Sequence, residues 1–144
     1  MTASMLHASC VSIEGAGIMI SGPSGSGKSD LALRLIDRGA TLISDDYVEL
    51  RLDQGRILLN APANIEGKIE LRSLGIFDCP HVSDIPLMMQ VLLKPTTARF
   101  PMDSQTETIM TMAVPTITLN AAEASAPIKV EMALRQLLKG SESA

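Results

Sequence analysis

Aromatic residues are scarce in this sequence, whose 144 residues include one tyrosine, two phenylalanines and no tryptophan. The side chains that commonly stack on a nucleobase are therefore nearly missing. Aliphatic residues and nine methionines replace them, since 46% of the positions are hydrophobic. Such a length and apolar content predict one domain, residues 1–144, that buries a core of aliphatic and methionine side chains.

Other features are also missing. The two cysteines, Cys10 and Cys79, fit no metal-ligand spacing, so we expect reduced thiols. No basic run is present and the net charge is -4, which argues against nucleic acid as a main partner. No apolar run approaches the ~20 residues of a membrane helix, and residues 1–10 lack the features of a signal peptide. We therefore expect a cytoplasmic protein without a membrane or nucleic-acid partner.

The stretch from Gly17 to Asp30, GIMISGPSGSGKSD, predicts a buried strand, a glycine-rich turn and the start of a helix. It fits the P-loop pattern G-x-x-x-x-G-K-[ST]. The glycines allow backbone N–H groups to point at a phosphate, and the helix start adds the positive end of its dipole. The residues expected to hold ATP are Gly22, Pro23, Ser24, Gly25, Ser26, Gly27, Lys28 and Ser29. A surface turn that binds nothing is the alternative.

Two residues of this loop have individual roles in the prediction. Lys28 can reach the β- and γ-phosphates as a point charge, and Ser29 can offer its hydroxyl to Mg²⁺. ATP and Mg²⁺ are therefore the expected cofactors.

The remaining pattern predicts an α/β fold with a mixed sheet and flanking helices. Residues 4–13 predict one strand, residues 28–38 a helix that ends before Gly39, and residues 41–43 a short strand. Residues 48–52 and 56–59 bracket a hairpin turn, and residues 69–72, 87–93 and 116–119 predict further strands. Residues 94–111 show no sustained period and predict a long loop, or a segment ordered only by partners. Residues 126–139 predict the last helix.

Two adjacent carboxylates, Asp45 and Asp46, follow the strand predicted at residues 41–43. The carboxyl ends of parallel strands share one sheet edge, so a carboxylate here can face the terminal phosphate. Side chains alternate along an extended chain, so one of the two is expected to face the nucleotide. We assign Asp45 as the general base of a phosphoryl transfer. A polar turn before Tyr47 is the alternative.

A wider set of motifs resembles one family. His7, the loop from Gly22 to Ser29, the run R-G-x-x-L-I-x-D-D at 38–46 and the run IELRSLGI at 69–76 together are similar to HPr kinase/phosphorylase. The match covers residues 5–78 and is closest to the short, catalytic-domain-only form known in α-proteobacteria. The resemblance implies an HPr kinase C-terminal-domain-like fold and phosphorylation of a serine of the phosphocarrier protein HPr, within the phosphotransferase system. It also implies a homo-oligomer, commonly a hexamer.

The resemblance also implies roles for single residues. Asp45 matches the proton acceptor, His7 a histidine with a part in the chemistry, and Glu70 a Mg²⁺ ligand beside Ser29. Arg72 can stabilise transferred charge, with a plain salt bridge as the alternative. Residues 69–78 are implied in both directions of the reaction, although the sequence favours the kinase direction over the phosphorylase one.

Two other functions stay open at this stage. A regulatory ATP-sensing module needs the loop but no general base, and a small-molecule P-loop kinase generally carries an arginine-rich lid.

Overall fold

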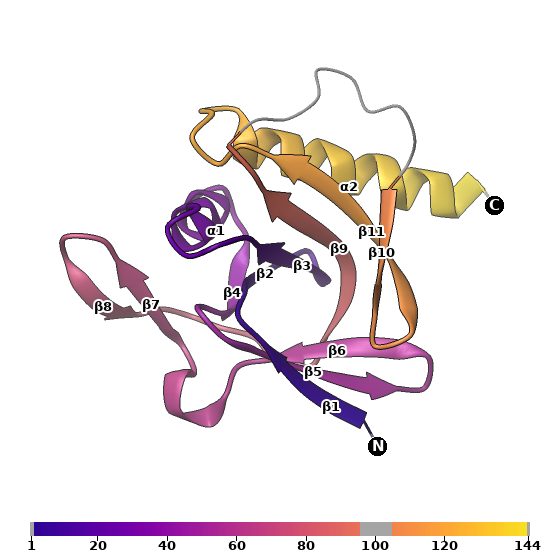
Figure 1. Ribbon diagram of the computed structural model, residues 1–144, viewed down its shortest axis with the longest axis horizontal. Coiled ribbons are helices and arrows are strands. Elements are labelled where there is room, and N and C mark those ends of the chain that lie inside the picture. Colours follow the sequence, from indigo (N-terminus) through magenta and orange to yellow (C-terminus); the bar gives the residue numbers. More distant parts are fainter. Residues whose placement is uncertain (1, 96–104, 144) are drawn as a thin grey trace.

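The structure of the protein is a computed structural model that describes residues 2–95 and 105–143. Figure 1 shows a strongly curved sheet with two helices on one side. The elements in chain order are β1 (Thr2–Leu6), β2 (Ser9–Ile13), β3 (Ala16–Ser21), α1 (Lys28–Asp37), β4 (Thr41–Ser44), β5 (Val48–Asp53), β6 (Arg56–Asn60), a 3-10 turn (Ala63–Ile65), β7 (Lys68–Leu71), β8 (Gly75–Asp78), β9 (Ile85–Leu93), β10 (Gln105–Ile109), β11 (Met112–Leu119) and α2 (Ala126–Ser143).

The main sheet is mixed, as the sequence predicts. Its described strands run in the order β1-β5-β6-β9-β3-β2-β4, with β11 also pairing with β9 and β10 with β11. The pairs β3–β9 and β9–β11 are parallel, and the other pairs are antiparallel. Because β2 is antiparallel to both β3 and β4, these two strands point the same way and end at the same edge of the sheet.

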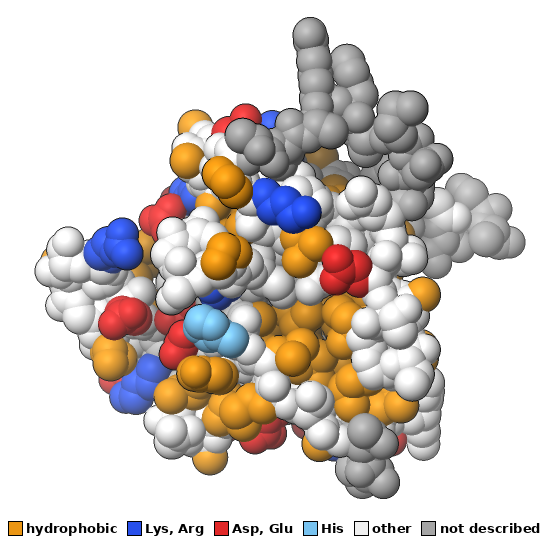
Figure 2. Space-filling view, viewed as in Figure 1, with side chains coloured by type: hydrophobic (Ala, Val, Ile, Leu, Met, Phe, Trp, Pro, Cys, Tyr) orange, Lys and Arg blue, Asp and Glu red, His pale blue; other side chains and the backbone are white. Residues whose placement is uncertain are grey.

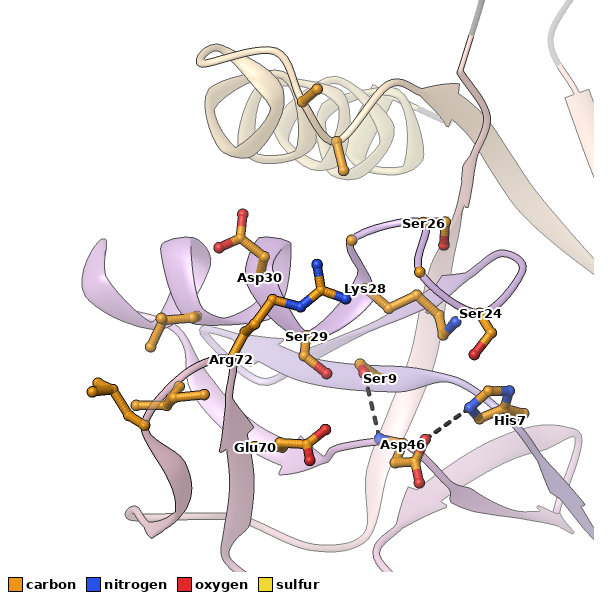
Figure 3. Close-up of a pocket in the computed structure, with 17 residues that line it drawn as sticks. His7, Ser9, Ser24, Ser26, Lys28, Ser29, Asp30, Asp46, Glu70 and Arg72 are labelled. Carbon is orange, nitrogen blue, oxygen red and sulfur yellow. Dashed lines mark hydrogen bonds and ion pairs between the residues drawn. The ribbon is translucent and has the colours of Figure 1, made fainter.

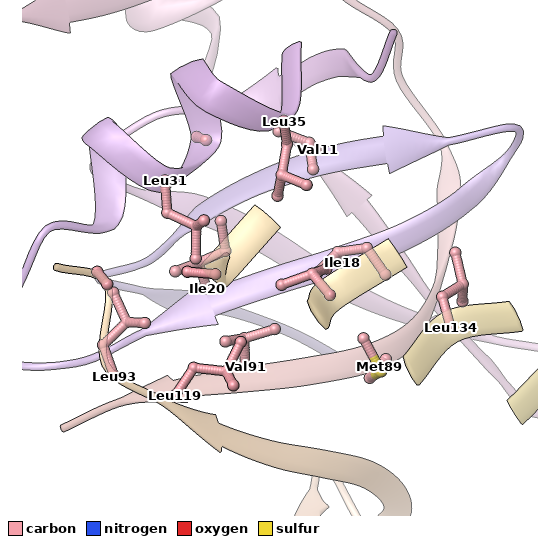
Figure 4. Packing of buried hydrophobic residues seen from close by; sticks show 14 of the residues in the cluster. Val11, Ile18, Ile20, Leu31, Leu35, Met89, Val91, Leu93, Leu119 and Leu134 are labelled. Carbon is pink, nitrogen blue, oxygen red and sulfur yellow. The ribbon is translucent and has the colours of Figure 1, made fainter. Parts of the chain in front are cut away.

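Strand β3 is the centre of the fold because both of its faces are buried. Its odd and even positions point to different hydrophobic clusters, as expected for an extended strand. Ile18 and Ile20 pack with residues of α1, α2 and β9 (Figure 4). Met19 packs in the second cluster, with residues of β4, β5 and β6. Because β3 is packed on both faces, the glycine-rich loop that follows it begins from a fixed position.

Helix α1 begins and ends where the sequence predicts. Gly27 precedes it with a φ of 100°, and Gly39 follows it with a φ of 113°, both in the left-handed region that favours glycine. The N–H of Gly39 bonds to the carbonyl of Ile36 and that of Ala40 to Leu35, which closes the last turn. Leu31 and Leu35 point into the core, so the helix is fixed to the sheet by its apolar face.

Two strand predictions need correction. Residues 4–13 form two strands, because the chain turns at His7 and Ala8 so that β1 pairs with β5 while β2 pairs with β3 and β4. Residues 105–109, predicted as loop, form β10, and the predicted strand 116–119 begins at Met112. The hairpin turn at Met110 and Thr111 has positive φ at both residues without the usual Gly or Asn, so its signal is absent from the sequence. Part of the loop prediction, residues 96–104, lies outside the described residues.

The last helix is longer than predicted, since it continues to Ser143. Neither described helix combines the length and hydropathy that crossing a membrane requires.

Candidate functional site

A cavity of about 650 Å³ lies at the edge of the sheet where β3 ends. Five parts of the chain line it: the glycine-rich loop with the start of α1, the turn after β1, the turn after β4, the β7–β8 hairpin, and the loop between β11 and α2. In Figure 3, Lys28 and Ser29 lie near the centre of the view, and Glu70 and Asp46 lie below them. The sequence motifs on residues 7–72 are therefore brought to one place.

The glycine-rich loop is folded back on the lysine that follows it. Lys28 Nζ donates hydrogen bonds to the carbonyls of Gly22 (2.8 Å) and Pro23 (3.1 Å), and the residue is only 7% exposed. Gly22 and Pro23 do not line the cavity, whereas the other residues predicted to hold ATP, Ser24 to Ser29, do. Gly25 has a φ of 81°, and the Oγ of Ser26 is buried without a partner among the described atoms. A loop at a helix start with a buried cation and an unpaired hydroxyl is suited to an anion.

Asp45 lies beneath the cavity and connects three elements. Its Oδ1 accepts hydrogen bonds from Ser29 Oγ (2.6 Å) and Ser9 Oγ (2.8 Å), and its Oδ2 accepts one from the backbone N–H of Glu70 (3.0 Å). The residue is 5% exposed and does not line the cavity. A carboxylate with three donors is well satisfied, and here it fixes the position of Ser29 relative to β7.

Asp46, rather than Asp45, faces the cavity. The expected facing assumed an extended chain, but the strand ends at Ser44 and Asp46 has a φ of 73°, a left-handed conformation that aspartate tolerates. The N–H of Tyr47 bonds to the carbonyl of Asp45 and closes this turn. The alternation of side chains along β4 therefore ends before Asp45 and Asp46, so it could not tell which of the two carboxylates faces the cavity.

His7 is the partner of Asp46. Its Nε2 lies 2.7 Å from Asp46 Oδ1, and both side chains line the cavity (Figure 3). The His7 ring also contacts the ring of Tyr47, with centroids 5.1 Å apart. The turn between β1 and β2 thus places the histidine that the sequence singled out directly on a carboxylate.

Glu70 in β7 and Arg72 in the turn that follows β7 both reach the cavity. The described parts of the chain hold no group of three or more His, Cys, Asp or Glu side chains that could bind a metal by themselves. Mg²⁺ in a phosphate site takes one or two carboxylates together with phosphate and water oxygens. Ser29, Asp46 and Glu70 all line the cavity and carry side-chain oxygens of this kind.

The cysteines are both free and contribute no ligand. Burial raises the pKa of the Cys10 thiol. Burial, and then the negative charges of Asp45 and Asp78, raise the pKa of the Cys79 thiol. Both thiols are therefore held in the protonated, weakly nucleophilic form.

Several lining residues escape prediction from sequence. Ser9 belongs to a strand that carries no motif, and its role depends on the antiparallel pairing of β2 with β4. Ala121 and Ala122 come from a loop far along the chain and offer only small side chains. Leu33 and Leu74 look like ordinary helix and hairpin residues.

The fold and the cavity together define a mixed-sheet domain with two helices and a site suited to a phosphate chain. Comparison with known families gives the same answer, since residues 1–142 match the family model of the HPr Serine kinase C-terminal domain. The chain belongs to the HPr kinase/phosphorylase family, in the part that this C-terminal domain represents.

Individual relatives agree with this assignment. The HPr kinase/phosphorylase of Burkholderia lata is 30% identical over 92% of this chain and 45% of its own length. That of Bacillus subtilis is 47% identical over 51% of this chain and 24% of its own. The solved structure of the Hpr(Ser) kinase/phosphatase from Coxiella burnetii superposes with a TM-score of 0.85 at 25% identity, covering 97% of this chain and 93% of that one. The chain therefore spans less than half the length of the Burkholderia lata and Bacillus subtilis proteins.

Proposed function

We propose that this protein is a Mg-ATP-dependent kinase that phosphorylates a serine of HPr. The observation that carries the proposal is the placement of the His7–Asp46 pair in the same cavity as Lys28 and Ser29. A module that only binds ATP needs Lys28 and Ser29 but has no need of His7 and Asp46. A carboxylate and histidine beside a phosphate site are the parts that a transfer reaction adds.

In this proposal the glycine-rich loop is a P-loop that holds the phosphates of ATP. Its N–H groups and the start of α1 bind oxygens of the phosphate chain, and Lys28 leaves the carbonyls of Gly22 and Pro23 to reach the β- and γ-phosphates. Ser29 and Glu70 would hold Mg²⁺, which neutralises developing charge on the phosphates. Asp45 keeps the Ser29 hydroxyl in place from below.

The transfer itself forms one bond and breaks another. The serine oxygen of HPr attacks the γ-phosphorus, the bond from that phosphorus to the β,γ-bridging oxygen breaks, and ADP leaves. Asp46 accepts the proton of the serine hydroxyl, because it is the carboxylate that faces the cavity. His7 holds the Asp46 carboxylate by its 2.7 Å contact. Arg72, on the same rim, adds positive charge where the phosphoryl group passes.

Several features of the relatives are extended to this chain on the same basis. The curated relatives are named kinase/phosphorylases, so removal of the phosphate from HPr is a second activity of the same site. We also propose that residues 1–144 act as one domain, that the protein forms a homo-oligomer, and that it works in the cytoplasm, where the phosphotransferase system operates.

The experiment is to incubate purified protein with γ-labelled ATP and HPr, with and without Mg²⁺, and to locate the label. We expect a Mg²⁺-dependent phosphoserine on HPr. Tight ATP binding with no label on HPr would instead identify the ATP-sensing module. Label on a small molecule and none on HPr would identify a small-molecule kinase.

A further inference from the structure

Arg34 connects α1 to the loop between β11 and α2. Its Nη2 donates to the carbonyl of Ala121 (2.5 Å) and its Nη1 to the carbonyl of Glu123 (3.1 Å). Its guanidinium also lies 3.0 Å from a carboxylate oxygen of Asp30, one turn earlier on the same helix. One planar side chain therefore bonds two carbonyls of a single loop, with a separate nitrogen of the arginine fork on each carbonyl.

The loop held by Arg34 lies directly against the glycine-rich loop. A Cβ placed on Gly27 would come within 2.9 Å of the Cβ of Ala121. Asn120 Oδ1 accepts the N–H of Ala122 and shapes the turn. Ala121 is buried and Ala122 is exposed, and both line the cavity that holds Lys28. The loop is thus a wall of the cavity, and Arg34 fixes its distance from α1.

The two sides of the cavity differ in chemistry. One carries His7, Asp46 and Glu70, to which the proposed function assigns the terminal phosphate and the acceptor serine. The other carries the small side chains of Ala121 and Ala122 together with the carboxylate of Asp30. Figure 3 shows Asp30 on the side of the α1 start away from Asp46 and His7, and the loop before α2 above it. A triphosphate that ends near Asp46 directs its nucleoside toward Ala121 and Ala122.

We propose that the wall formed by Ala121 and Ala122 binds the nucleoside part of ATP, and that Arg34 is the positioning residue that holds this wall. The inference rests on the proposed function, because it needs the phosphates at the glycine-rich loop. It explains how a site with almost no aromatic residues distinguishes a nucleotide from a bare phosphate chain: a flat base packs against small side chains and backbone. Arg34 does not touch the phosphates in this arrangement.

The test compares Mg²⁺-loaded ATP with inorganic tripolyphosphate as ligands of the purified protein. Arg34→Lys keeps the charge beside Asp30 but loses the fork, and Arg38→Lys is the matched control. Arg38 lies one turn further along the chain and bonds Glu131 of α2 instead, with Nε and Nη2 on its carboxylate. We expect Arg34→Lys to weaken ATP binding about fivefold, as for one lost charge-assisted hydrogen bond, with tripolyphosphate unchanged. Arg38→Lys should leave both affinities unchanged.

Equal losses for both ligands, or no loss for ATP, would overturn the role of Arg34. A measurement on the unaltered protein keeps the test independent of folding: ATP, but not tripolyphosphate, should shift the amide NMR signals of Ala121 and Ala122. Identical shifts with both ligands would place the nucleoside elsewhere. If the unaltered protein binds neither ligand, the proposed function fails and takes this inference with it, a result distinct from binding both equally well.

Discussion

Two regions reach the same cavity but are built differently. The glycine-rich loop and α1 sit on the central strand β3, with Leu31 fully buried in the larger core cluster. The β7–β8 hairpin projects from the body at the left of Figure 1. The hairpin exposes Leu74 and Ile76 at 71% and 70%, and Figure 2 shows charged side chains of both signs at this left edge. Its buried anchor is Ile69, 3% exposed.

This difference separates the two regions of the site by how firmly each is packed against the core. The loop side has little freedom, which suits groups that must hold a phosphate chain in one geometry. The hairpin side is attached mainly through Ile69 and the hydrogen bond from the Glu70 N–H to Asp45. Asp45 therefore joins the glycine-rich side, through Ser29, to the β7–β8 hairpin, through Glu70.

A large effect is expected on the rigid side. Lys28→Ala removes the charge that follows the γ-phosphate, and we expect phosphoryl transfer to HPr to fall by on the order of 10²–10³. The fold should persist, because Lys28 bonds only loop carbonyls and packs no core cluster. The measurement is the transfer assay together with circular dichroism. Normal turnover by a folded variant would remove the loop from the mechanism.

A pair of leucine substitutions tests the comparison through stability. Leu31→Ala should lower the free energy of unfolding by about 2–5 kcal/mol, because it opens a cavity in the core. Leu74→Ala should change it by less than about 0.5 kcal/mol, since this side chain is already in solvent. Urea denaturation measures both. Similar losses for the two variants would mean that the hairpin is as firmly packed as α1.

The two residues that we propose hold Mg²⁺, Ser29 and Glu70, lie one on each side, so they sharpen the comparison further. We expect Ser29→Ala and Glu70→Gln each to raise the Mg²⁺ concentration needed for half-maximal transfer by about tenfold, as loss of an oxygen contact to a hard cation does. Mg²⁺ titrations of the transfer rate provide the values. Unchanged requirements in both variants would show that the metal is held elsewhere.

The smallest effect concerns Asp84, away from the site. Hydrogen bonds from Asn60 and then Arg51 lower the pKa of Asp84 below its usual range. A carboxyl whose pKa is lowered by folding stabilises the folded state at pH values above its unfolded pKa. This stabilisation is lost as the pH falls below about 4. Asp84→Asn should therefore cost well under 1 kcal/mol at pH 7, because the pair is exposed and screened. The difference in melting temperature from the unaltered protein should shrink steadily as the pH falls through the acid range.

Local patterns explain what the sequence could predict. The strand, loop and helix around Lys28 follow from residues adjacent in the chain, and so do the turn glycines that limit α1. The split of residues 4–13 depended on which distant strands pair with each half. The β10–β11 turn lacked its usual residues, and the wall at Ala121 arises only from a long-range contact with Arg34. Nothing nearby in the sequence marks such contacts.

The choice between Asp45 and Asp46 shows the same limit at the scale of one residue. Both carboxylates were evident from the sequence, and the motif placed them at the correct sheet edge. Their facing depended on the left-handed backbone of Asp46, which ends the alternation of the strand. The roles therefore separate only in three dimensions, with one carboxylate as a buried connector and the other open to the cavity.

The most direct test is to measure ATP affinity and the rate of transfer to HPr for Asp46→Asn and Asp45→Asn side by side. We predict that Asp46→Asn keeps ATP affinity within a few-fold but loses transfer by on the order of 10²–10⁴, the usual share of general acid–base catalysis. Asp45→Asn should chiefly raise the Mg²⁺ requirement, because an amide has one accepting oxygen where the carboxylate uses one oxygen for Ser29 and the other for the Glu70 N–H. An Asp46→Asn protein at full transfer rate, beside an Asp45→Asn protein that binds Mg-ATP normally and transfers nothing, would contradict the account.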